Sequence, residues 1–65
     1  MKGKIIKFFR FRGFGFIAPE DGDEEIFFHI SNYPNFESPE IGVEVEFEIE
    51  MTDKGKAAIN IQEIS

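Results

Sequence analysis

Two short stretches of the sequence carry aromatic rings at alternate positions. Residues 12–17 read Arg-Gly-Phe-Gly-Phe-Ile, and residues 26–31 read Ile-Phe-Phe-His-Ile-Ser. In a β-strand successive side chains point to opposite faces, so alternate rings share one face. With the two strands side by side, that face is a flat aromatic platform formed by Phe14, Phe16, Phe27 and His29. Such a platform suits unpaired bases, because every base has a π-face on which a ring can stack.

The alternative position for these phenylalanines is the hydrophobic core, where large apolar side chains usually lie. An inward face is already supplied by other apolar residues, namely Ile17, Ile26, Phe28, Val43, Val45, Phe47, Ile49, Ile59 and Ile61. Phe14, Phe16 and Phe27 stand at the opposite alternate positions. Each exposed ring forgoes about 1.5 to 3 kcal/mol of burial. We therefore interpret them as a binding surface, with burial or a protein interface as the alternatives.

Other residues that could do chemistry do not form a catalytic or metal site. His29 is the only histidine and there is no cysteine, so we expect stacking on a base, or else a half-exposed structural histidine. The acidic run 21–25 lacks the ligand pattern of a calcium loop and is predicted to be a solvated turn. Gly13 and Gly15 lack the third glycine of a dinucleotide fingerprint, and are better explained by a bend or a close approach. We expect neither an enzyme nor a cofactor or metal.

Length and composition indicate one small domain spanning residues 1–65. A chain of this size buries only about 60% of the surface of its unfolded form, and without cysteine it has no disulfide to stabilise it. No apolar run approaches the roughly 20 residues of a membrane span, and the start does not resemble a signal segment. We expect a soluble, cytoplasmic monomer with no membrane or small-molecule partner.

The charges are unevenly distributed along the chain. The net charge is -6, which by itself argues against a nucleic-acid partner. The first twelve residues contain no acid and hold most of the cations, namely Lys2, Lys4, Lys7, Arg10 and Arg12; Lys54 and Lys56 are the others. Glutamates alternate along residues 44–50 and are interpreted as a wet face that repels phosphate. Because the screening length is about 8 Å, a local cationic edge can still act on a phosphate.

The pattern predicts an all-β fold of short strands. The expected strands are residues 4–9 with a possible bulge, 13–18, 25–31, 43–50 and 57–62. In the last strand, Ile59 and Ile61 are expected to face inward and Ala58 outward. In the first strand, the sequence does not assign Phe9 to either face. Residues 32–42 read as a loop with at most a single helical turn at 32–34. Five strands in so small a chain are expected to close into a barrel, which removes exposed edges.

The two ring-bearing stretches resemble the paired ribonucleoprotein motifs of the cold-shock domain. The similarity extends to Lys7-Phe8-Phe9, Phe36, Lys54-Gly55 and Ala58-x-Asn60-Ile61, so that it covers nearly the whole chain. The RNA-recognition motif has a similar first motif, but it is longer and places its second motif first. The resemblance implies a five-stranded antiparallel OB-type barrel that binds single-stranded RNA and DNA and acts as a nucleic-acid chaperone.

The resemblance also implies which residues bind. The expected binding face consists of Lys7, Phe8, Phe14, Phe16, Phe27, His29 and Phe36, with Arg12 and Lys54 near phosphates. Phe8 replaces a tryptophan of the family, and Ile30 replaces a base-stacking phenylalanine. The connection after Phe9 is one residue shorter than usual and carries the additional aromatic Phe11.

Overall fold

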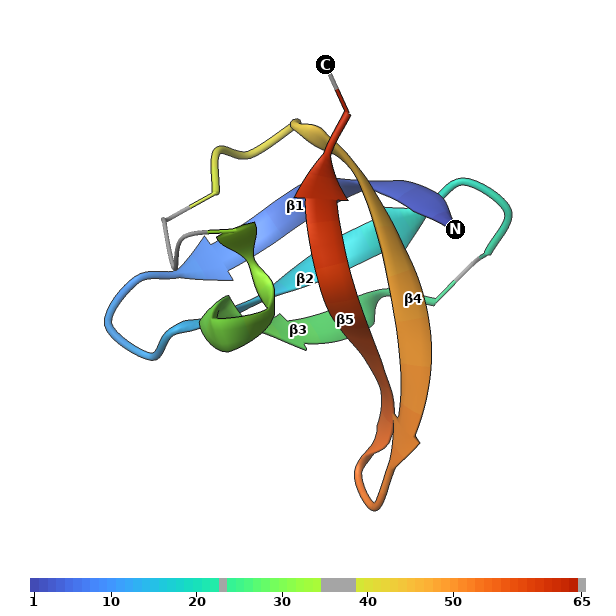
Figure 1. Ribbon diagram of the computed structural model, residues 1–65. Helices are drawn as coiled ribbons and strands as arrows, with labels where there is room; N and C mark the ends of the chain where they lie inside the picture. The colour runs from blue at the N-terminus through green and yellow to red at the C-terminus, as the bar shows by residue number, and fades with distance from the viewer. Residues whose placement is uncertain (23, 35–38, 65) are drawn as a thin grey trace.

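Five strands and one short 3₁₀ helix make up the secondary structure of this computed structural model, which describes residues 1–22, 24–34 and 39–64 (Figure 1). The elements are β1 (Lys2–Phe9), β2 (Phe14–Pro19), β3 (Ile26–His29), η1 (Ile30–Asn32), β4 (Glu44–Thr52) and β5 (Gly55–Glu63). The helical turn thus lies two residues earlier than predicted. Phe36 lies outside the described residues.

The strands form one closed barrel in the order β1-β2-β3-β5-β4, and β4 returns to pair with β1. The predicted all-β fold with five strands is therefore confirmed. Its pairings are antiparallel except that of β3 with β5, which is parallel. In Figure 1 the β4–β5 hairpin crosses in front of the β1-β2-β3 sheet and its tip projects beyond the barrel.

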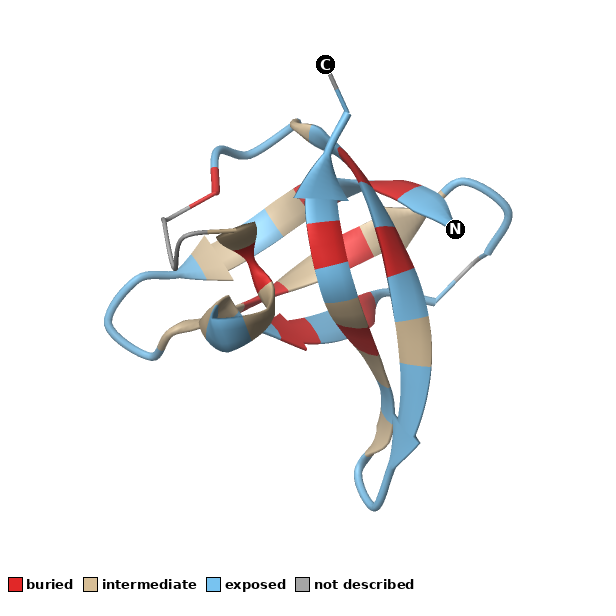
Figure 2. Ribbon diagram, viewed as in Figure 1, coloured by how far each residue is buried: buried red, intermediate tan, exposed pale blue. Residues whose placement is uncertain are grey.

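Buried residues occur on every strand of the barrel (Figure 2), and their apolar side chains form one core. Its buried side chains are Ile5, Ile17, Ile26, Phe28, Tyr33, Val45, Phe47, Ala58 and Ile61, with Phe8, Val43 and Ile49 packed against them. β4 shows the alternation most clearly, because Val45 and Phe47 are buried while the glutamates between and beside them are exposed. One face of each strand therefore points into the barrel and the other faces water.

A bulge in β1 decides which of its side chains face outward. Ile5 pairs with Ile17, but the next pair joins Lys7 to Phe16, so Ile6 is the extra residue. An extra residue shifts the alternation by one position. Lys7 and Phe9 consequently face outward beyond the bulge, which settles the face of Phe9.

A second irregularity lies in β5 and corrects the predicted alternation there. Ala58 is fully buried, whereas Ile59 is only partly buried, the reverse of the expectation. The pairing with β4 shifts between Glu46 and Glu48, and Asn60 adopts a left-handed φ of 52°. A bulge at Asn60 therefore separates the inward residues Ala58 and Ile61 by three positions instead of two.

Two glycines in the first ring-bearing stretch have separate structural roles. A Cβ on Gly15 would lie 2.8 Å from the ring of Phe28 and would overlap the carbonyl oxygen of Lys7. Gly15 thus lets β1 and the core ring pack closely against β2. Gly13 has a left-handed φ of 71° and ends the turn between β1 and β2, a conformation that glycine adopts without cost.

The segment after β3 is fixed to the barrel by Tyr33. Its side chain is buried, and its hydroxyl group donates a hydrogen bond to the carboxylate of Glu63 on β5. Its ring centre lies 6.2 Å from that of Phe28. This anchor holds η1 against β5, and η1 follows directly after His29.

Candidate nucleic-acid interface

The strand register aligns the outward side chains of β1, β2 and β3 in two rows. One row consists of Phe9, Phe14 and His29, which are direct neighbours across the three strands. The other row consists of Lys7, Phe16 and Phe27. Directly opposed side chains on neighbouring strands lie about 4.5 to 5.5 Å apart at Cβ. The two rows therefore form one continuous surface rather than separate exposed rings.

Four rings of these rows contact one another, and we call Phe9, Phe14, Phe16 and Phe27 the ring cluster. The centre of Phe14 lies 5.1 Å from Phe9, 5.5 Å from Phe27 and 6.0 Å from Phe16. Phe16 lies 6.2 Å from Phe27 and 6.5 Å from Phe9, both in edge-on contacts. Tilted and edge-on pairs at these distances attract one another beyond simple burial. The rings therefore hold one another in place.

The ring cluster is open to water. Phe9 is 43% exposed and Phe27 is 38% exposed, while Phe14 and Phe16 between them are half-buried. The structure thus places Phe14, Phe16 and Phe27 together on the outer face, away from the core. A surface of several exposed rings on a domain this small indicates a binding site.

Phe8 and Phe9 lie on opposite faces of β1, and it is Phe9, which the sequence did not assign to a face, that faces outward. Phe8 is half-buried, and its ring stacks on the core ring of Phe28 at 6.1 Å and an interplanar angle of 16°. It lies opposite Gly15, on the inner side of β1, so it is not among the outward rings, and its contact with nucleic acid stays a prediction. The bulge at Ile6 is the reason, because it turns Phe9 outward in its place. The only sequence signal for this register shift was that apolar and polar residues do not alternate cleanly in residues 4–9.

His29 is exposed and its ring orientation is fixed. Its Nδ1 accepts a hydrogen bond from the backbone N–H of Ser31 at 3.1 Å and lies 2.9 Å from the hydroxyl oxygen of Ser31. With Nδ1 occupied as an acceptor, the neutral ring carries its proton on Nε2. The imidazole therefore offers both a flat face and a free donor beside Phe14.

Lys7 lies over the ring cluster. Its Nζ is 5.9 Å from the ring centre of Phe16, a cation–π distance, and 3.5 Å from Oε1 of Glu25. Both partners of this ion pair are about half exposed, so it is weak and readily exchanged for another anion. Lys7 thus supplies a positive charge at the edge of the rings.

Further cations lie at the two ends of the surface. Lys54 lines a pocket of about 280 Å³ together with Phe27, Thr52, Lys56 and Ala57, next to the ring cluster. Lys56 was not among the predicted binding residues, and its position became clear only from the parallel pairing of Phe27 with Ala57. At the other end, Arg12 lies in the turn that joins Phe9 to Phe14.

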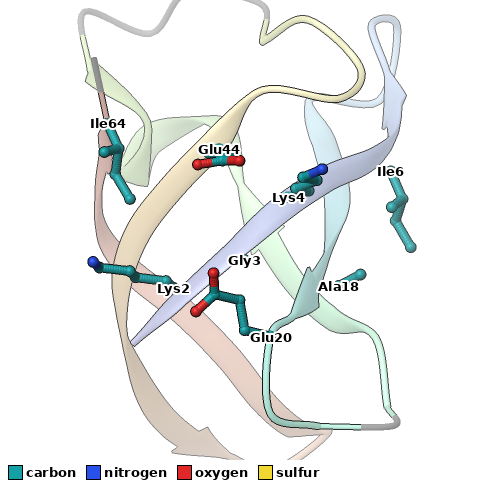
Figure 3. Close-up of a pocket in the computed structure, with 8 residues that line it drawn as sticks. All are labelled: Lys2, Gly3, Lys4, Ile6, Ala18, Glu20, Glu44 and Ile64. Atoms are coloured by element: carbon teal, nitrogen blue, oxygen red, sulfur yellow. The ribbon is translucent and has the colours of Figure 1, made fainter.

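The acidic strand lies on another wall. β4 borders β1 and β5 but neither β2 nor β3, so its exposed glutamates point away from the ring cluster. Another pocket of about 280 Å³ opens beside the first half of β1, around Gly3 (Figure 3). Lys2, Lys4, Glu20 and Glu44 line it with balanced charges, and no aromatic ring does. Neither surface is suited to stacking bases.

The described part of the chain holds neither a metal-binding cluster nor a membrane-spanning helix. Within residues 1–22, 24–34 and 39–64, no three histidine, cysteine, aspartate or glutamate side chains are grouped to hold a metal ion. In the same part of the chain no helix has both the length and the apolar character needed to cross a membrane.

A closed five-stranded barrel with exposed rings and cations on one wall is the arrangement used by small barrels that bind single strands. Comparison with known proteins agrees. The family model of the 'Cold-shock' DNA-binding domain matches residues 1–64. The chain therefore belongs to the cold-shock DNA-binding domain family, whose members bind nucleic acid.

Individual relatives cover almost the full chain. Cold shock-like protein CspC of Buchnera aphidicola is 41% identical over 63 aligned positions, and the alignment covers 94% of this chain and 91% of that protein. CspC of Escherichia coli K12 is 41% identical over 66 aligned positions, and the alignment covers 98% of this chain and 96% of that protein. The solved structure drosophila Unr CSD456 has a TM-score of 0.84 and 26% identity; the match covers 98% of this chain but only 26% of that longer one.

Proposed function

We propose that the protein binds single-stranded RNA or DNA by stacking unpaired bases on the ring cluster and on His29. The observation that carries this proposal is the mutual contact of four outward rings in two cross-strand rows. Each stacked base contributes about 1 to 3 kcal/mol, and stacking tolerates any base sequence. Duplexes hide their base faces and are expected to bind poorly.

The cations around the rings receive the phosphates. Lys7, Arg12 and Lys54 are exposed, and two of them border rings of the cluster. With about two or three phosphates neutralised, log affinity falls with log salt at a slope of roughly -1.4 to -2.1, from about -0.7 per contact. Stacking therefore supplies most of the affinity, and binding persists at moderate salt.

Phe9 and Lys56 are added to the predicted binding residues, while Phe8, whose ring stacks on the core ring of Phe28, stays a predicted contact. Phe36 stays a predicted contact, since it lies outside the described residues. By holding strands in the unpaired state, the protein acts as a nucleic-acid chaperone that opposes RNA secondary structure and so affects translation or transcription. We place this activity in the cytoplasm and assign it to the monomer.

An NMR titration tests the assignment directly. A short pyrimidine oligonucleotide is added to the protein, and the ring signals of the phenylalanines and of His29 are followed. The same strand annealed to its complement serves as the control. We expect shifts of the ring-cluster signals with the single strand and far smaller ones with the duplex. Unchanged ring signals with the single strand contradict the proposal.

A further inference from the structure

The turn between β1 and β2 carries a fully exposed aromatic ring. Phe11 is 106% exposed, more than any other large apolar side chain of the described residues. It is flanked by Arg10 and Arg12, which are also exposed. An apolar ring that buries nothing contributes nothing to folding through its own contacts. Its presence between two cations therefore calls for another explanation.

The turn itself is well ordered. The carbonyl oxygen of Phe9 accepts hydrogen bonds from the N–H of Arg12 at 3.1 Å and from the N–H of Gly13 at 2.8 Å. The carbonyl oxygen of Gly13 in turn accepts one from the N–H of Ile30 at 2.9 Å, which ties the turn to η1. Arg10 and Phe11 are thus the central residues of a fixed chain reversal.

The composition of this turn is unusual. Glycine, proline, asparagine, aspartate and serine dominate chain reversals because they fit the backbone or bond to it. Here only Gly13 has that function, and residues 10–12 read Arg-Phe-Arg. Local rules are broken mostly where a site requires it. Arginine and an aromatic ring are also the two side-chain types that bind single strands, by charge and by stacking.

The turn directly continues the ring cluster. Phe9, a member of the cluster, accepts both hydrogen bonds that close the turn, and Phe14 begins the strand on its other side. A ring at this tip lies beyond the row of Phe9, Phe14 and His29, at the end opposite Lys54. A single strand of nucleic acid bound across the ring cluster can therefore reach Phe11 when it extends past that row.

We propose that Phe11 stacks on one further unpaired base beyond the ring cluster, while Arg10 and Arg12 contact the phosphates on either side of that nucleotide. This rests on the proposed function, because it lengthens the same binding surface. The turn then acts as a preformed end subsite that lengthens the bound strand by one nucleotide.

Binding of a length series tests the inference. Oligothymidines lengthened one nucleotide at a time are titrated against the wild type, Phe11→Ala and the control Ile41→Ala. Ile41 is 62% exposed and lies outside the strands that carry the rings. We expect wild type and control to gain about fivefold or more in affinity at one length, and Phe11→Ala to lack that step. Short oligonucleotides bind all three proteins equally, and melting temperatures stay unchanged.

A fluorescent base analogue locates the step. Placed at each end of the longest oligonucleotide in turn, it is quenched at one end by wild type, and that quenching disappears in Phe11→Ala. The variant Arg10→Gln lowers the salt slope by about 0.7 for long oligonucleotides. The slope for short ones is unchanged.

The outcomes separate the two proposals. If Phe11→Ala keeps the affinity step and the end quenching, the inference is wrong while the ring cluster stands. If no oligonucleotide binds the wild type, both fail. If Phe11→Ala leaves nucleic-acid binding unchanged but abolishes self-association in sedimentation, the turn is a contact between copies of this chain, which also overturns the inference.

Discussion

Replacing Phe27 tests whether bases stack on the ring cluster. Phe27 is 38% exposed, and its ring centre lies 5.5 Å from Phe14 and 6.2 Å from Phe16. Full burial of such a side chain is worth about 1.5 to 3 kcal/mol, so with roughly three fifths buried Phe27→Ala costs about 1 to 2 kcal/mol of folding stability. Loss of one stacked base costs a similar 1 to 3 kcal/mol, which raises the dissociation constant about 5- to 150-fold.

Two further variants separate these effects. Phe27→Leu keeps the apolar bulk but removes the π-face, so we expect a stability loss under about 1 kcal/mol with most of the binding loss. Phe27→Tyr keeps the ring and should bind within a fewfold of wild type. Met51→Ala, at a residue that is 71% exposed, controls for truncation of an exposed apolar side chain.

The assays are fluorescence anisotropy with a labelled pyrimidine strand and urea unfolding of the same samples. Affinity is compared only where each variant is folded. If Phe27→Leu binds as tightly as wild type, apolar contact rather than stacking holds the strand. If Phe27→Ala also binds normally, the strand does not lie on the ring cluster at all.

Three other predictions follow from single contacts. Glu25→Gln frees Lys7 from its 3.5 Å ion pair, so the affinity for single strands should rise. Lys7→Gln should lower that affinity and reduce the salt slope by about 0.7. Titrations at several salt concentrations check both variants. Gly15→Ala places a Cβ 2.8 Å from the ring of Phe28 and should destabilise the fold by about 1 to 3 kcal/mol in urea unfolding; a stability equal to wild type contradicts that close packing. Asn60→Gly should be neutral or stabilising at φ 52°, whereas Asn60→Ala should cost about 1 kcal/mol in thermal melts; equal losses in both refute a requirement for the left-handed conformation.

Strict alternation made much of this barrel predictable from sequence. β4 repeats glutamate and apolar residues without interruption, and its buried and exposed residues fall where the pattern puts them. The outward placement of Phe14, Phe16 and Phe27 followed from the same rule, because β2 and β3 pair without a register shift.

The failures occur where a strand contains an extra residue. Ile6 shifts the register in β1, so Phe9 rather than Phe8 joins the ring cluster. Asn60 does the same in β5 and buries Ala58 in place of Ile59. Each bulge lies in the pairing with an adjacent strand along the chain, β1 with β2 and β5 with β4, and its position depends on cross-strand contacts that alternation within one strand does not show. Composition therefore indicated a bulge in β1 but could not locate it.

Pairing between distant segments also explains why Lys56 was missed. Its role depends on the parallel contact of β3 with β5, which brings Ala57 beside Phe27. Sequence spacing carries no signal for that contact, because residues 30–54 separate the two strands. Only closure of the barrel places the β4–β5 hairpin and its lysines next to the ring cluster.

Contact among the rings lowers the free-energy cost of exposing them to water. Taken singly, each exposed phenylalanine forgoes the free energy of burial, yet Phe14 touches three other rings and is half-buried by them. Such pairs contribute about 0.5 to 1.5 kcal/mol beyond burial, which offsets part of that loss. The same contacts restrict the rings before any strand arrives, so less conformational entropy is lost on binding. A cluster of mutually packed rings therefore loses less free energy on exposure to water than the same rings scattered over the barrel. It also loses less conformational entropy when a strand of nucleic acid binds.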